Sequence, residues 1–203
     1  MATATAELAR RDPVMAGLIE MAGPCRLKRA GLDHFGALAR SIVYQQLAGK
    51  AAAAIHGRLL ALFDGDFTPD AVLALPYETL RGAGLSGSKA ASLVDLSDKV
   101  ASGVVRLDDI SRQSDEEIVR RLVVVRGIGR WTAEMFLIFQ LGRLDVWPVD
   151  DYGVRSGYAI AYARPELPAP KALIELGEPF RPYRSVAAWY FWRAVEAARE
   201  PGR

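Results

Sequence analysis

Helical spacing dominates the apolar residues of this chain, and the strict alternation that is typical of β-strands is nearly absent. In residues 32–46, for example, apolar side chains recur about every 3.6 residues, at Phe35, Leu38, Ile42 and Val43. Only residues 103–107 suit a brief extended segment. The pattern therefore predicts an all-α protein.

Capping residues indicate where several of these helices begin. Thr68 followed by Pro69 is typical of an N-cap and a first helical turn, and Ser114 with Glu117 fits a capping box. Two glycine-bearing turns, at 82–87 and 127–129, each lie between helices and form a faint internal repeat. From these signals we expect further helices at residues 51–63, 69–75, 89–101, 129–141, 151–162 and 183–199.

The composition sets limits on the class of protein. A chain of 203 residues that is 51% hydrophobic can bury a sizeable core in one large domain or two small lobes. Because the net charge is only +2, any binding to nucleic acid must come from local patches and backbone amides. No apolar run reaches the roughly 18 residues of a membrane span, and the N-terminus lacks the apolar segment of a signal peptide. We therefore expect a cytoplasmic protein, nucleoid-associated if it is bacterial.

Few residues are suited to metal binding. Cys25 is the only cysteine, which excludes an intrachain disulfide, a cysteine-rich zinc site and a cysteine-ligated iron–sulfur cluster. With only His34 and His56, a multi-histidine metal site is nearly excluded as well. We expect no required cofactor.

A Gly-Ile-Gly turn, residues 127–129, separates two predicted helices. Glycine permits a tight turn and a close approach of the main chain to a phosphate. The helix that starts near Gly129 directs its unpaired N–H groups at the turn, where its dipole favours an anion, and Arg126 and Arg130 flank it. By itself the turn fits an ordinary helix–helix connection equally well.

The residues after this turn resemble a known family. The pattern Leu122-x4-Gly-Ile-Gly-x-Trp-Thr-Ala, followed by the Asp-Val-Trp-Pro-x-Asp-Asp that ends at Asp151, resembles the helix-hairpin-helix DNA glycosylases. The match is best to the DNA-3-methyladenine glycosylase II (AlkA-type) branch and extends from about residue 32 to 192. The resemblance implies two helical lobes with a DNA-binding cleft between them, in the compact form that lacks an N-terminal mixed α/β domain. Residues 1–203 would form a single glycosylase domain, with one lobe at about 32–140, including the hairpin, and the other at about 1–31 plus 141–203.

The resemblance assigns Asp151 as the catalytic carboxylate, with Asp150 as the second candidate. A carboxylate in a water-poor site stabilises the positive charge that develops on the sugar when an N-glycosidic bond is hydrolysed, and it can orient or deprotonate water. The alternative is that both residues only cap the following helix. If Asp151 is catalytic, we expect Asp150 to cap that helix or to pair with an arginine such as Arg184.

Aromatic side chains carry the expected selection of the base. Trp131 and Trp192 match the pocket aromatics of the family, and an indole attracts a cationic alkylated purine by stacking and cation–π contact. Met135 lies on the face of Trp131, where some relatives carry an aromatic residue. The alternative is that these tryptophans fill the core. We expect Trp147, Trp189 and Tyr190 to lie in the core or in the wall of the pocket.

Position 131 also bears on the reaction class. Relatives that cleave the strand through a Schiff base carry lysine where this chain has Trp131, and no lysine occurs between Lys99 and Lys171. The sequence therefore resembles the monofunctional class, which leaves an abasic site and has no AP-lyase activity.

The resemblance also supplies a wedge and contacts to the DNA backbone. The wedge that fills the gap left by the flipped base would be Leu47, with Gln46 and, less strongly, Gln45 beside it. The alternative is that Leu47 packs under the turn. A monovalent cation, sodium or potassium, would bind the carbonyl groups of Val123, Val125 and Ile128. The residues expected to contact the backbone are Gly127, Gly129, Arg130, Thr132, Lys50 and Lys89.

Together these features predict a monofunctional DNA glycosylase of base excision repair that acts on alkylated purines of the 3-methyladenine and 7-methylguanine type. Its partner would be double-stranded DNA containing alkylated bases, with no membrane association, and the protein would be a monomer. Two alternatives remain: a non-enzymatic helix-hairpin-helix DNA-binding module, and a related glycosylase for oxidised or mismatched bases.

Overall fold

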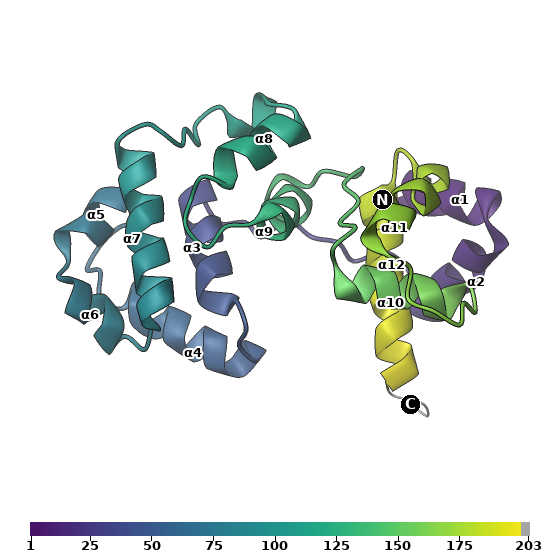
Figure 1. Ribbon diagram of the computed structural model, residues 1–203, viewed down its shortest axis with the longest axis horizontal. Helices are drawn as coiled ribbons and strands as arrows, with labels where there is room; N and C mark the ends of the chain where they lie inside the picture. The colour runs from purple at the N-terminus through teal and green to yellow at the C-terminus, as the bar shows by residue number, and fades with distance from the viewer. Residues whose placement is uncertain (200–203) are drawn as a thin grey trace. The chain divides into compact units, whose positions relative to one another are not determined.

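The computed structural model describes residues 1–199, and within that range it is all-helical with no strand (Figure 1). No described helix is both long and apolar enough to cross a membrane. The α-helices are α1 (Ala2–Arg11), α2 (Pro13–Ala22), α3 (His34–Tyr44), α4 (Gly49–Leu60), α5 (Pro69–Ala74), α6 (Tyr77–Gly82), α7 (Gly87–Ala101), α8 (Asp115–Leu122), α9 (Arg130–Met135), α10 (Tyr152–Ala161), α11 (Pro170–Leu176) and α12 (Arg184–Arg199).

The helices fall into two compact units. Unit 1 comprises Met1–Arg29 together with the chain from Leu137 onward, and unit 2 comprises Ala30–Phe136. Unit 1 is therefore built from two separate stretches of sequence, whereas unit 2 is continuous.

An aromatic cluster forms the core of unit 1 where α10 packs on α12. Tyr190 and Phe191 of α12 are fully buried there, and Phe180 is nearly so. Helices α1 and α2 complete this core from the other stretch of sequence, with Leu8 and Met15 buried in the same cluster. The two helices are in close contact at Gly157 of α10, where a Cβ atom would lie 2.0 Å from the carbonyl oxygen of Phe191.

Capping residues start the helices largely as the sequence predicts. The Thr68 hydroxyl accepts a hydrogen bond from the Ala71 N–H at 3.2 Å, and Ser114 accepts one from the Glu117 N–H at 3.3 Å. Helix α7 begins two residues before the predicted start at 89, because Ser86 caps it through the N–H of Lys89.

Two expectations from the sequence are wrong in detail. Residues 103–105 form a turn and a bend, and residues 106–107 have no regular secondary structure, so this segment is not a strand. The predicted helix at 129–141 is not one α-helix, because α9 ends at Met135 and a π-helical segment, Phe136–Leu141, follows. Apolar spacing does not distinguish the two, since a π-turn adds one residue to the hydrogen-bonded ring without changing which residue types suit it.

Candidate DNA-binding hairpin and active site

The Gly-Ile-Gly turn joins α8 to α9 within unit 2 as a helical hairpin. Gly127 has φ of 77°, a left-handed conformation that favours glycine, and Gly129 caps α9 with φ of −92°. Ile128 between them is 3% exposed, and its N–H donates to the carbonyl oxygen of Val125 at 3.0 Å. The buried isoleucine thus anchors the turn. The two exposed glycines have no side chains, so the main chain of the turn is accessible.

Side chains of α3 and α7 hold this turn in place. The Arg126 N–H donates to Asp95 of α7 at 2.7 Å, and Asp95 also forms an ion pair with Lys99. Burial would raise the pKa of Asp95, but the hydrogen bonds from Lys99 and Arg126 outweigh it and lower the pKa. From the end of α3, the amide of Gln45 donates to the Gly127 carbonyl at 2.8 Å. The turn is therefore braced by an ionised carboxylate and an amide.

Gly127→Ala should destabilise the hairpin. An added Cβ would lie 2.6 Å from the hydroxyl of the buried Ser92, and alanine is strained at this positive φ. We expect a loss of about 2 kcal/mol in the free energy of unfolding, measured by urea denaturation, together with weaker binding to duplex DNA.

Gly129→Ala is the matched control for that change. At Gly129 the φ is negative and nothing lies within 4 Å of the added Cβ. The free energy of unfolding should therefore change by less than about 1 kcal/mol. Equal losses for the two variants would contradict the role assigned to Gly127.

Other predicted backbone contacts have contrasting surroundings. Arg130 is an exposed side chain that pairs with Glu116 at 3.1 Å and lies 3.6 Å from Glu134. Thr132 is 6% exposed, with its hydroxyl turned toward the Gln45 amide at 3.5 Å. Arg130 is thus accessible to a phosphate, whereas Thr132 lies inside the hairpin.

The predicted wedge lies in a short loop between α3 and α4. Leu47 is 39% exposed and does not pack under the turn, and its neighbour Gln46 is exposed with a left-handed φ of 55°. The two lysines predicted to bind phosphate differ. Lys50 is exposed, whereas Lys89 is half-buried and its ammonium group donates a hydrogen bond to the carbonyl oxygen of Val43 at 2.6 Å.

The faint repeat in the sequence has a structural counterpart at residues 84–86. Gly84 has a positive φ of 101°, Leu85 is 3% exposed, and Ser86 caps the next helix, which repeats the arrangement at 127–129. In this second turn, side chains donate to three carbonyl groups: Arg58 to Ala83, Arg81 to Leu85 and Tyr77 to Gly87.

Asp151 lies in unit 1 as the N-cap of α10 and is 8% exposed. Its Oδ1 atom accepts hydrogen bonds from the Val154 N–H at 2.7 Å and from the indole N–H of Trp192 at 2.8 Å. Capping is thus one function of this carboxylate, and the indole contact is a second interaction that a cap alone does not need.

The expected capping role of Asp150 is wrong. Asp150 is exposed and does not cap α10, since the N-cap is Asp151. Arg184 binds Asp145, with its Nε donating to that carboxylate at 2.8 Å. The guanidinium reaches Asp145 because both residues flank the buried Val146–Ser185 contact, in which the Val146 N–H donates to the Ser185 hydroxyl.

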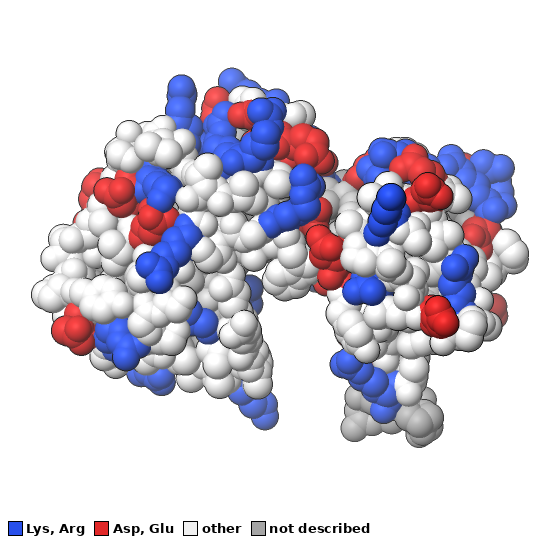
Figure 2. All heavy atoms as spheres, in the orientation of Figure 1, with Lys and Arg blue, Asp and Glu red and all other residues white. Residues whose placement is uncertain are grey.

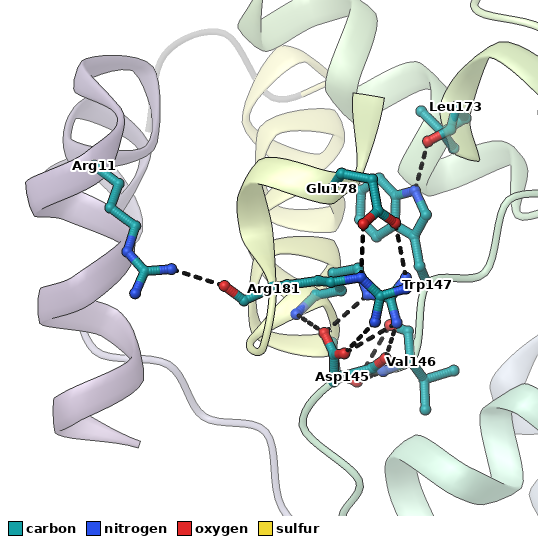
Figure 3. A network of polar contacts seen from close by, with 9 residues as sticks. Arg11, Asp145, Val146, Trp147, Leu173, Glu178 and Arg181 are labelled. Carbon is teal, nitrogen blue, oxygen red and sulfur yellow. Dashed lines mark hydrogen bonds and ion pairs between the residues drawn. The ribbon is translucent and has the colours of Figure 1, made fainter. Parts of the chain in front are cut away.

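A polar network fixes the segment that leads to Asp151 (Figure 3). Asp145 pairs with Arg181 at 2.9 Å as well as with Arg184, and Arg181 also pairs with Glu178. Two residues further on, the indole N–H of Trp147 donates to the Leu173 carbonyl at 2.7 Å. The chain therefore approaches Asp151 along a segment bound on both its exposed and its buried side.

Most of the chain, including the hairpin and the capping aspartate, matches a known protein family. A family model described as HhH-GPD superfamily base excision DNA repair protein matches residues 39–182. The chain belongs to the HhH-GPD superfamily. It is similar to DNA-3-methyladenine glycosylase 1 of Schizosaccharomyces pombe, with 36% identity over 89% of this chain and 82% of that protein.

Two solved structures resemble this HhH-GPD protein over nearly its whole length. One is the 3-methyladenine DNA glycosylase Mag1 of Schizosaccharomyces pombe in complex with abasic DNA, with a TM-score of 0.85, 33% identity and 98% of each chain covered. The other is the DNA-3-methyladenine glycosidase of Bacillus halodurans, with a TM-score of 0.85, 36% identity, and 95% and 89% of the chains covered.

The aromatic residues of this HhH-GPD protein divide between its units. In unit 2, Trp131 is 44% exposed and Met135 is half-buried. In unit 1, the half-buried Trp192 stacks on Phe139, with ring centroids 5.7 Å apart and planes 21° from parallel. Trp147, Trp189 and Tyr190 are buried, as the sequence predicts for core residues.

Phe139 is a candidate that the sequence interpretation missed. It is 37% exposed within the π-helical segment and is the stacking partner of Trp192 beside Asp151. A regular helical projection does not place it correctly, because the π-turns shift every following side chain around the axis. Among residues 1–199, no group of three or more His, Cys, Asp or Glu side chains is placed to hold a metal ion.

Proposed function

We propose that this HhH-GPD protein is a monofunctional DNA glycosylase that removes alkylated purines of the 3-methyladenine and 7-methylguanine type from duplex DNA. The observation that carries the proposal is the buried Asp151 carboxylate, held by the Trp192 indole and preceded in the chain by the glycine hairpin. The similarity to proteins named DNA-3-methyladenine glycosylase supports the choice of substrate class.

The carboxylate of Asp151 supplies the electrostatic part of the reaction. As the bond between C1′ and the base nitrogen breaks, the bonding electrons leave with the cationic purine, which departs neutral. Positive charge then develops on the sugar, and the carboxylate stabilises it. Water adds its oxygen to C1′ and gives up a proton to the carboxylate, which leaves an abasic site.

Aromatic faces supply the preference for damaged bases. Trp131, Trp192 and Met135 form the proposed base-binding set, to which Phe139 is added by its stacking on Trp192. A cation over an indole face gains about 0.5–2 kcal/mol. A neutral base lacks this gain, so charge itself distinguishes alkylated purines from ordinary ones.

The grip on DNA comes from local features rather than from a general positive field. Acidic and basic side chains are interspersed over the face in Figure 2, and the net charge is only +2. The proposed backbone contacts are the main chain at Gly127 and Gly129, with Arg130 and Lys50 as accessible cations. Leu47 enters the stack as the flipped base leaves it. We propose that one copy of the chain acts on one duplex.

A monovalent cation at the hairpin is part of the proposal. The Val125 carbonyl accepts the Ile128 N–H, and its second lone pair leaves capacity for a cation alongside the carbonyl groups of Val123 and Ile128. Such an ion would link the turn to a DNA phosphate. Exchanging potassium for tetramethylammonium at constant ionic strength should lower DNA affinity severalfold, because the larger ion does not fit between carbonyl groups. Unchanged affinity would contradict the site.

Strand cleavage is not expected, because Trp131 occupies the place of the lysine in lyase-active relatives. No lysine occurs between Lys99 and Lys171, so neither the hairpin nor α10 supplies an amine for a Schiff base.

One assay tests the reaction class. Duplex DNA treated with dimethyl sulfate is incubated with the protein, and the released bases are separated chromatographically while the strand is followed on a denaturing gel. We expect 3-methyladenine and 7-methylguanine in solution, with strand breaks only after treatment with alkali. Binding without release would favour a non-enzymatic DNA-binding module, and breaks without alkali would overturn the monofunctional assignment.

A further inference from the structure

The wedge loop, residues 45–48, has little support of its own. It leaves α3 after Tyr44 and enters α4 at Gly49, and its Leu47 N–H reaches the Tyr44 carbonyl at 3.4 Å. Gln46 has a left-handed backbone, which costs a non-glycine residue about 1 kcal/mol. A loop of this kind keeps one conformation only if neighbouring elements hold it.

Lys89 holds the loop from the side of α7. Its ammonium donates to the carbonyl of Val43, in the last turn of α3, where carbonyl groups have no partner inside the helix. The cation also faces the negative end of that helix dipole. Burial lowers the pKa of Lys89, as expected for an amine withdrawn from solvent. One of the three N–H donors of this ammonium is therefore used to hold the end of α3.

Gln45 holds the loop from the side of the hairpin. Its amide donates to the Gly127 carbonyl at 2.8 Å, in the turn that Asp95 fixes through the Arg126 N–H. The chain immediately before the exposed Leu47 is thus tied to both glycine-bearing turns, by Gln45 to residues 127–129 and by Lys89 to the helix that follows residues 84–86.

We propose that Lys89 and Gln45 are positioning residues for the wedge loop, which act on base flipping through Leu47 and not through contact with DNA. The inference rests on the proposed function, in which Leu47 enters the duplex. It assigns Lys89 a different task from Lys50, although both lysines follow a helix start in the sequence.

The salt dependence of DNA binding separates the two lysines. A lysine that binds a phosphate displaces a counterion, so its loss should reduce the slope of log affinity against log salt by about 0.9. We expect that reduction for Lys50→Met. For Lys89→Met we expect the wild-type slope, and a slope reduced as much as in Lys50→Met would overturn the inference.

Insertion of the wedge is measured with duplexes that carry 2-aminopurine beside a stable abasic analogue, where an inserted side chain changes the fluorescence. Leu47→Ala should lose most of this change. Lys89→Met and Gln45→Met should each lose a large part of it and release 3-methyladenine about tenfold more slowly in single turnover. Lys89→Arg keeps a cationic donor and should recover part of the signal.

A double-mutant cycle decides whether the positioning residues act through Leu47. In the Leu47→Ala background, Lys89→Met should cause no further loss, because the wedge that it positions is already removed. If the losses from Leu47→Ala and Lys89→Met add, the inference is wrong, but the proposed wedge role of Leu47 is unaffected. If Leu47→Ala gives the same fluorescence change as the wild type, both the wedge role of Leu47 and the inference are wrong. Should Lys89→Met fail to fold, Gln45→Met replaces it in the same cycle with Leu47→Ala, because Gln45→Met removes the other bond that holds the loop.

Discussion

Asp151→Asn should slow the release of 3-methyladenine by about 100- to 1,000-fold in single turnover while the protein remains folded. Asparagine removes the negative charge that, in the proposed mechanism, stabilises the developing positive charge on the sugar. It keeps an oxygen that can accept hydrogen bonds from the Val154 N–H and the Trp192 indole. Asparagine is also among the best N-cap residues, so α10 retains its start.

Two further variants locate the effect. Asp150→Asn should release base at close to the wild-type rate, because that side chain is exposed and lies outside the cap. Asp151→Ala should lose activity and, in addition, about 1 kcal/mol of stability, since it removes the cap as well as the charge. Equal rates for wild type and Asp151→Asn would show that the carboxylate has no part in bond cleavage.

Gly157→Ala should produce the largest loss of stability, about 3 kcal/mol or more, measured by urea or thermal unfolding. The added Cβ would lie 2.0 Å from the carbonyl oxygen of Phe191 and 2.5 Å from its carbonyl carbon. These are main-chain atoms, which no rotamer change can move, so α10 and α12 would have to separate. Because the two helices carry Asp151 and Trp192, the hydrogen bond between them should weaken as well.

Gly17→Ala is the control for the same substitution inside a helix. Gly17 is exposed in α2, and nothing lies within 4 Å of its added Cβ. Alanine should stabilise that helix by about 0.5–1 kcal/mol, because glycine loses more backbone entropy on folding. A similar loss in both variants would mean that the α10–α12 contact is not the cause.

The sequence predicts much of this protein because its helices are specified locally. Ser114 and Thr68 cap helices through atoms three residues away, so their roles can be read from short patterns. Gln45, Lys89 and Phe139 are different, because each depends on a partner distant in sequence or on a π-turn. The sequence therefore cannot show that Lys89, unlike Lys50, donates to the end of α3, because that contact exists only when α3 and α7 are packed together.

The two aspartates show the same limit on a smaller scale. Either Asp150 or Asp151 satisfies the preference for an aspartate at a helix start, and the resemblance to a family was needed to choose between them. In the structure Asp151 is the N-cap of α10, and the N–H groups of Val154 and Trp192 both donate to it. The second of these donors lies 41 residues away and leaves no local signature.

The discontinuous make-up of unit 1 has a consequence for biosynthesis. Unit 2 is one uninterrupted stretch, so the hairpin and the wedge loop can fold while the ribosome is still translating the C-terminal helices. The unit that contains Asp151 cannot, because α1 and α2 must wait for α12, which also brings Trp192 to the carboxylate. A nascent chain should therefore acquire the proposed DNA contacts first and the proposed catalytic carboxylate last.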